Sequence, residues 1–148
     1  MKNFKKKLTF VGILSLLTIG TITTSCSSSD DNTNYEQPTS GTIDAAVGTY
    51  KGKLRSSLLE QYEYFDAVII VTKVDNQHLK VEAKSGEAYS SVTSKTFKVE
   101  NSYNNNINNV NGILEGYFWY TAEVKTLELG TNQQAEGEIN FLFDGVKQ

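Results

Sequence analysis

The 148-residue chain contains a single cysteine, Cys26, so it cannot form an internal disulfide. It also contains a single histidine, His78, which excludes a zinc site built from several cysteine and histidine ligands. No motif for an activated serine or thiol nucleophile surrounds His78, and the chain has no phosphate-binding glycine loop. Asp75 and Asn76 form a turn pair rather than the alternating acidic loop that binds calcium. We therefore predict no metal and no cofactor, and we interpret His78 as a solvated turn residue.

Two carboxylates remain as candidates for catalysis. Glu136 and Glu138 are two residues apart and share a face of a predicted strand, and a carboxylate pair can hydrolyse glycosidic bonds. Acidic residues elsewhere in the chain also alternate with apolar ones, which is the pattern of a solvated sheet face. We therefore predict that the protein is not an enzyme.

The chain starts with four lysines among its first seven residues, followed by an uncharged, mostly apolar run from Leu8 to Ile22. This order is typical of a signal peptide, and the run is too short for a comfortable membrane-spanning helix. Small residues then lead into Cys26. A secreted chain with one unpaired cysteine needs an explanation, because a free thiol is reactive outside the cytoplasm. We predict a signal peptide over residues 1–25.

The stretch "TTSCSSSDD" around Cys26 resembles the lipobox of bacterial lipoproteins. In that family the cysteine becomes the first mature residue and carries acyl chains that anchor the protein in the membrane. Ser29, Asp30 and Asp31 resemble the acidic tag of surface-exposed lipoproteins of Bacteroidota. The resemblance implies an outer membrane lipoprotein at the cell surface, with the membrane as its partner through Cys26. The alternatives are an ordinary cleaved signal peptide and a Ser/Asp-rich segment that merely stays solvated.

Residues 26–44 contain the only proline, Pro38, and are rich in serine, threonine, asparagine and aspartate. Tyr35 and Ile43 are their only large apolar side chains, so this segment cannot bury enough apolar area to offset the entropy of ordering. We predict a flexible tether over residues 26–44 and one folded domain over residues 45–148, a length that suits a single core.

Basic residues are scarce once the leader is removed. Four of the 14 basic residues lie within residues 1–25, which hold no acidic residue, so the remainder has ten basic against 17 acidic residues. Its formal charge is −7, whereas the value for the whole chain is −3. Nucleic-acid binding needs the opposite sign, and we therefore exclude nucleic acid as a partner.

The predicted domain contains no convincing helix, and its short runs alternate with the period of two that is typical of strands. In "TYKGKLR", Tyr50 and Leu54 share one face while Lys51 and Lys53 share the other. Turn-forming residues separate the runs. The predicted strands span about eight ranges: 47–55, 63–73, 77–84, 88–93, 95–101, 112–119, 120–129 and 134–144.

Three segments lack a simple alternating pattern, so their structure is harder to predict. The run "YFDAVIIVTKV" is apolar on both faces, which predicts a central strand covered on each side, with a buried helix as the alternative. The run "RSSLLEQYEY" is a loop or a helical turn, and the asparagine-rich range 101–112 is predicted to be a long polar loop.

Sequential strands joined by short turns predict an all-β, antiparallel meander that closes into a small up-and-down barrel. A β-sandwich is the alternative. The first and last strands, "GTYKGKL" (48–54) and "INFLFDG" (139–145), resemble those of calycin-like, or lipocalin-like, small lipoproteins of Bacteroidota. The pair Gly48 and Tyr50 matches the Gly-x-Tyr or Gly-x-Trp pair of that group. The resemblance implies a non-enzymatic binding protein.

The aromatic run "ILEGYFWYTAEV" contains the only tryptophan. Its more apolar face carries Phe118 and Tyr120, which leaves Tyr117 and Trp119 on the polar face. An exposed tryptophan beside a tyrosine can stack on a sugar ring or anchor a protein contact, and Tyr62, Tyr64 and Tyr103 could extend such a surface. The alternative is that these rings fill the barrel or plug its mouth.

Together these patterns predict a lipid-anchored binding protein of the cell envelope. Its ligand is a small apolar molecule or a glycan, and Tyr117 and Trp119 are the predicted binding residues. The alternative is a structural accessory lipoprotein with a filled barrel that binds an envelope protein.

Overall fold

The computed structural model describes residues 41–110 and 114–148. The predicted signal peptide, Cys26, the acidic tag and residues 26–40 of the tether lie outside the described residues. The described residues include no helix with the length and apolar character needed to cross a membrane.

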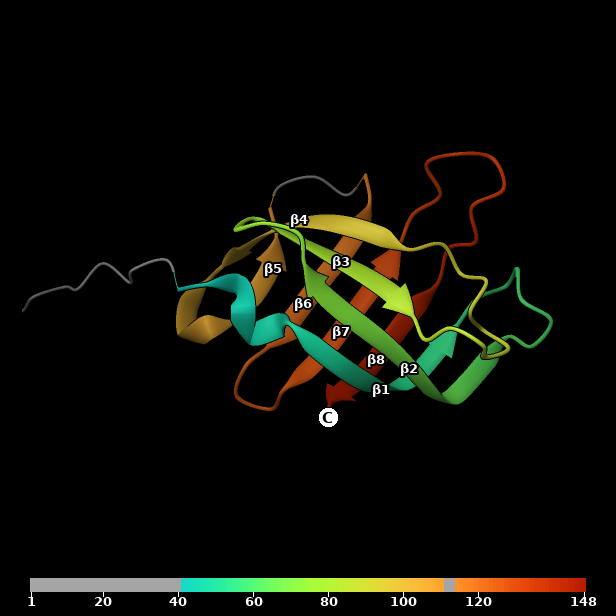
Figure 1. Cartoon of the computed structure of the whole chain (residues 1–148), viewed down its shortest axis with the longest axis horizontal. Helices are drawn as coiled ribbons and strands as arrows, with labels where there is room; N and C mark the ends of the chain where they lie inside the picture. Colours follow the sequence, from blue (N-terminus) through green and yellow to red (C-terminus); the bar gives the residue numbers. More distant parts are fainter. Residues whose placement is uncertain (1–40, 111–113) are drawn as a thin grey trace, which may run out of the picture. The chain divides into compact units, whose positions relative to one another are not determined.

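Eight antiparallel strands form a closed barrel, and each strand pairs with the next in sequence (Figure 1). The last strand also pairs with the first, which leaves the sheet without open edges. The predicted all-β meander barrel is confirmed, and the β-sandwich alternative is wrong. This architecture is consistent with a calycin-like fold. The strands are β1 (Gly48–Arg55), β2 (Glu63–Lys73), β3 (His78–Ala83), β4 (Lys95–Asn101), β5 (Ile107–Asn109), β6 (Gly116–Thr121), β7 (Thr126–Thr131) and β8 (Leu142–Lys147).

The strand count is correct, but one predicted strand is wrong and one strand was missed. Residues 88–93 form turns, and Tyr89 and Val92 in this loop are buried. The strand that the sequence did not predict is β5, which lies in the asparagine-rich range predicted to be a loop. The predicted boundary after residue 119 falls inside β6, because the turn comes at residues 122–125, where Lys125 has a positive φ. The last strand begins at Leu142 rather than near residue 134.

The strand β2 is another correction. It has the predicted bounds, but only one face is covered: Ala67, Ile69 and Val71 are buried, whereas Phe65 is 65% exposed and Ile70 is 37% exposed. Ile70 alternates with these buried residues and therefore faces outward in a closed barrel. Phe65 is exposed where the β1–β2 register shifts between Gly52 and Leu54.

Large side chains from the inward faces meet inside the barrel and form one core. The ring of Tyr50 packs edge-on against Tyr120 at 6.1 Å, and Phe97 packs against Phe118 at 5.6 Å. Rings of this size in an eight-strand barrel fill the interior with side chains. The remaining fully buried large residues include Leu54, Ile69, Leu79, Ile107, Leu127, Leu129, Phe141 and Phe143.

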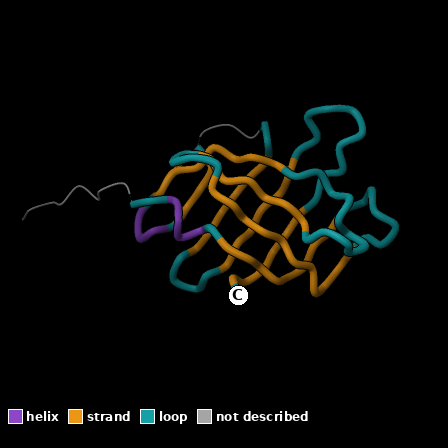
Figure 2. Tube along the Cα trace, in the orientation of Figure 1, coloured by secondary structure: helices purple, strands orange, loops and turns teal. Residues whose placement is uncertain are grey.

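A short 3-10 helix, η1 (Ile43–Ala46), covers one end of the barrel (Figure 2). Ile43 and Ala46 are buried, the Tyr50 hydroxyl donates a hydrogen bond to the Ala46 carbonyl at 2.7 Å, and Lys73 pairs with Asp44 at 2.8 Å. Ile43 therefore packs on the barrel and Asp44 forms an ion pair with β2, although the sequence placed both residues in the tether. A second 3-10 turn, η2 (Tyr103–Asn105), follows β4.

Three loops meet at the opposite end. The backbone N–H of Thr93 donates to the Ile139 carbonyl, and the Ile139 N–H donates to the Thr93 hydroxyl, both at 2.9 Å. The Ser56 hydroxyl donates to the Asn140 carbonyl at 2.6 Å. These bonds tie the β3–β4 and β1–β2 loops to the β7–β8 loop, so each end of the barrel is covered.

Candidate functional site

A pair of exposed aromatic side chains lies on the outside of β6. Alternation along this strand turns Phe118 and Tyr120 into the core and leaves Trp119 59% exposed and Tyr117 46% exposed. Both rings therefore point outward, as the alternation predicts. Their role in binding stays a prediction. The three other tyrosines considered above come from other elements: Tyr64 packs against Tyr89, Tyr62 precedes β2, and Tyr103 lies in η2.

The register of the sheet decides which residues surround these rings. Tyr117 lies opposite Gly130 on β7, and Gly130 lies opposite Leu142 on β8. A Cβ atom at Gly130 would collide with the Tyr117 ring and would approach Leu142 Cδ2 to 2.8 Å. Glycine at this position therefore lets the Tyr117 ring lie across β7 beside Leu142.

Two carboxylates form the next row of the same surface. Trp119 lies opposite Glu128, and Glu128 lies opposite Asp144. Both carboxylates are exposed, and neither has an ion-pair partner in the described part of the chain. We call this surface the aromatic face; its members are Tyr117, Trp119, Glu128, Gly130, Leu142 and Asp144.

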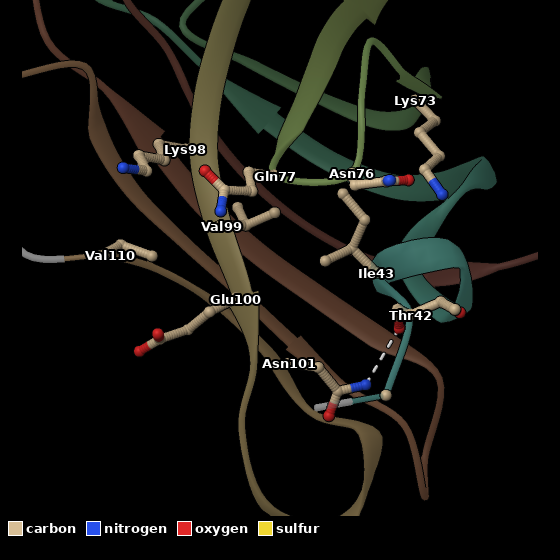
Figure 3. Close-up of a pocket in the computed structure, with 11 residues that line it drawn as sticks. Thr42, Ile43, Lys73, Asn76, Gln77, Lys98, Val99, Glu100, Asn101 and Val110 are labelled. Carbon is tan, nitrogen blue, oxygen red and sulfur yellow. Dashed lines mark hydrogen bonds between the residues drawn. The ribbon is translucent and has the colours of Figure 1, made fainter. Parts of the chain in front are cut away.

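A separate pocket of about 620 Å³ lies beside η1. Its walls come from η1, β4 and the β2–β3 turn, with Ile43, Val99 and Val110 as apolar members (Figure 3). The Asn101 side chain donates to the Thr42 carbonyl at 3.0 Å across it. Lys73 and Lys98 project in different directions in Figure 3, so the pocket does not bring their charges to one point. We call it the η1 pocket.

The two carboxylates that were considered for catalysis have different surroundings. Glu136 is exposed, whereas Glu138 accepts hydrogen bonds from the backbone N–H of Gln134 and the Lys95 ammonium, both at 2.6 Å. These two hydrogen bonds hold the pKa of Glu138 below its ordinary value of 4.5. A carboxylate whose pKa is lowered is poorly suited to act as a general acid at neutral pH.

The single histidine, His78, is the first residue of β3 rather than part of the turn before it, and its side chain is 36% exposed. Its Nδ1 lies 2.7 Å from the nearer carboxylate oxygen of Asp75. The pKa of Asp75 is lowered, mainly by the hydrogen bond from the Gln77 N–H and then by the contact with His78. Within residues 41–110 and 114–148, no three His, Cys, Asp or Glu side chains come close enough to hold a metal ion.

The residues that sequence reasoning missed are Glu128, Gly130, Leu142 and Asp144. Each is separated from Trp119 by a turn or a long loop, and each joins the aromatic face only through the register of β6, β7 and β8. The alternation of β7 and β8 predicts which side chains point outward, but it does not predict which of them are neighbours.

No protein-family model, curated protein or solved structure matches this chain.

Proposed function

We propose that this protein is a non-enzymatic, lipid-anchored binding protein of the cell envelope that recognises a glycan on its aromatic face. The proposal joins the lipoprotein-like sequence around Cys26 to the barrel surface. It places the protein among calycin-like lipoproteins of Bacteroidota, at the outer membrane and exposed on the cell surface. The observation that carries it is the side-by-side exposure of Tyr117 and Trp119 on a barrel whose interior is filled.

The chemistry of the face supports a sugar. Trp119 and Tyr117 offer rigid, flat apolar area with a polar edge, on which the C–H face of a pyranose ring can stack. The adjacent carboxylates of Glu128 and Asp144 accept hydrogen bonds and are free to receive them from sugar hydroxyls. A small apolar ligand inside the barrel has less support, because Tyr50, Phe97 and Phe118 occupy the interior.

The test uses a soluble form that begins at Ser27, which retains every described strand and core residue. The form is screened against a panel of immobilised oligosaccharides, and the best binder is titrated by calorimetry. Trp119→Ala should weaken binding at least about tenfold, because a central aromatic anchor carries much of the binding energy. Tyr103→Ala is the matched control, since Tyr103 is 74% exposed but lies in η2. Equal affinity of the Trp119→Ala variant and the parent would contradict the proposal.

A second candidate function is a partner-binding accessory lipoprotein. The observations that favour it are the filled interior of the barrel and the exposed apolar outer face of β2, which carries Phe65 and Ile70. Phe65→Ser with Ile70→Ser should then abolish capture of an envelope protein and leave glycan binding unchanged. Capture that survives both substitutions would remove this candidate.

A further inference from the structure

The charges around Trp119 narrow the class of glycan, and this step rests on the proposed function. We propose that the aromatic face binds a glycan that carries protonated amino groups, such as an oligomer of glucosamine. The argument starts from the two carboxylates next to the tryptophan and from where the neighbouring cations point.

Glu128 and Asp144 lie directly opposite each other on β7 and β8. Side chains at directly opposite positions of an antiparallel pair are near neighbours, and like charges there destabilise the sheet. Both side chains belong to the outer face of the barrel, so water screens this repulsion without removing it. A cation placed between them would convert the repulsion into attraction.

The barrel itself does not supply that cation. Lys53 lies opposite Asp144 on β1, but its ammonium pairs with Glu63 at 3.6 Å and lies 5.2 Å from the ring centre of Phe65, on the β2 side. Arg55 lies opposite Leu142 and makes no ion pair with any described residue. The carboxylates beside Trp119 therefore stay open to a cation from outside.

Trp119 makes an organic cation the better fit. An ammonium group near an indole face is attracted by the ring, and a carboxylate beside it adds a charge-assisted hydrogen bond. Trp119 and Glu128 are opposite neighbours, so both contacts are available to one amino group on a sugar that stacks on the ring. A calcium ion would need six to eight oxygen ligands, whereas this face presents two carboxylates.

The experiment titrates the soluble form with three probes of matched length and follows the fluorescence of Trp119, the only tryptophan. The probes are a glucosamine oligomer, its N-acetylated and therefore neutral counterpart, and oligolysine. The variant is Glu128→Gln with Asp144→Asn. The control is Glu60→Gln with Glu136→Gln, which changes the net charge equally at two exposed sites away from the face.

We expect the glucosamine oligomer to bind at least tenfold more tightly than the N-acetylated oligomer at low salt. This preference should shrink as salt is added, and it should disappear in the Glu128→Gln/Asp144→Asn variant while the control pair keeps it. The N-acetylated oligomer should bind the parent and the variant alike.

Other outcomes overturn the inference in distinguishable ways. Equal affinity for the amino and N-acetylated oligomers shows that the carboxylates do not select the ligand, and the proposed function survives. If oligolysine binds as tightly as the glucosamine oligomer, the aromatic face recognises positive charge alone and does not select a sugar. Failure of all three probes, together with failure of the wider oligosaccharide panel, overturns both the inference and the proposed function.

Discussion

At the scale of single residues, Lys95 is a buried cation with only 5% of its side chain exposed. Its ammonium donates to Glu138 at 2.6 Å and to Gln134 at 3.0 Å, which joins the start of β4 to the β7–β8 loop. A buried charge is tolerated only where a partner compensates for its lost hydration. Glu138, which the sequence offered as a possible catalytic group, therefore has a structural role at the loop end of the barrel.

The stability of the protein should depend on pH through the ion pair between Lys95 and Glu138. The folded-state pKa of Glu138 is lowered, first by the Gln134 N–H and then by Lys95, so its contribution is complete above the ordinary pKa of 4.5 and is lost as pH falls through the folded value. We expect Glu138→Gln to lower the urea midpoint at neutral pH and to lose less stability than the parent on acidification. Glu136→Gln is the control, and parallel pH profiles for parent and Glu138→Gln would contradict the assignment.

At the scale of elements, the asparagine-rich segment is the thinnest part of the barrel wall. The strand β5 has three residues, and only two of them pair with β6. The side chain of Asn109 continues the ladder: its Oδ1 accepts from the Phe118 N–H at 3.1 Å and its Nδ2 donates to the Gly116 carbonyl at 3.3 Å. Asn106 does the same at the other end, where it accepts from the Ala122 N–H at 2.9 Å. Amide side chains thus stand in for missing backbone partners.

Removing one of these amides should weaken the wall. Asn109→Ala leaves the Phe118 N–H and the Gly116 carbonyl without the partner they have now, so we expect a loss of about 1–3 kcal/mol in unfolding free energy, measured by urea denaturation. Asn76→Ala, in the exposed β2–β3 turn, is the matched control and should change stability little. Equal effects of the two substitutions would show that the Asn109 ladder contributes nothing.

At the scale of the whole molecule, closure depends on the seam between β1 and β8. Gly52 and Gly145 lie opposite each other there. A Cβ atom at Gly52 would collide with the Asp144 carbonyl oxygen and with Gly145 Cα, both of which are backbone atoms that cannot swing aside. The two glycines therefore allow the first and last strands to approach closely enough to close the barrel.

Gly52→Ala should therefore open or strain the seam. We expect a loss of about 3 kcal/mol, at the upper end of the range for overpacking, in a denaturant titration. Gly86→Ala is the comparison, because Gly86 has a φ of 81° but no atom within 4 Å of its Cβ position. Its cost is that of the left-handed backbone alone, about 1 kcal/mol. A Gly86→Ala loss as large as that of Gly52→Ala would rule out crowding at the seam as the cause.

Local sequence patterns predict the class of fold and the side of the strand on which the key rings lie. Period-two alternation around Tyr50, Phe97 and Phe118 predicts inward faces, and the same alternation turns Tyr117 and Trp119 outward. This information is local, because each residue of a strand points opposite to its neighbour whatever the strand pairs with. The bounds of β2 and β4 also match the predicted ranges, 63–73 and 95–101.

Which residues become neighbours depends on how distant parts of the chain pair in the folded barrel. Asparagine side chains supply hydrogen bonds around β5 that a propensity scale does not assign to a strand, whereas residues 88–93 form a loop in which only Tyr89 and Val92 are buried. The outer face of β2 is exposed because closure leaves one face of every strand outside. Glu128 and Asp144 meet beside Trp119 only through a register fixed by barrel closure, which depends on contacts between residues far apart in the chain.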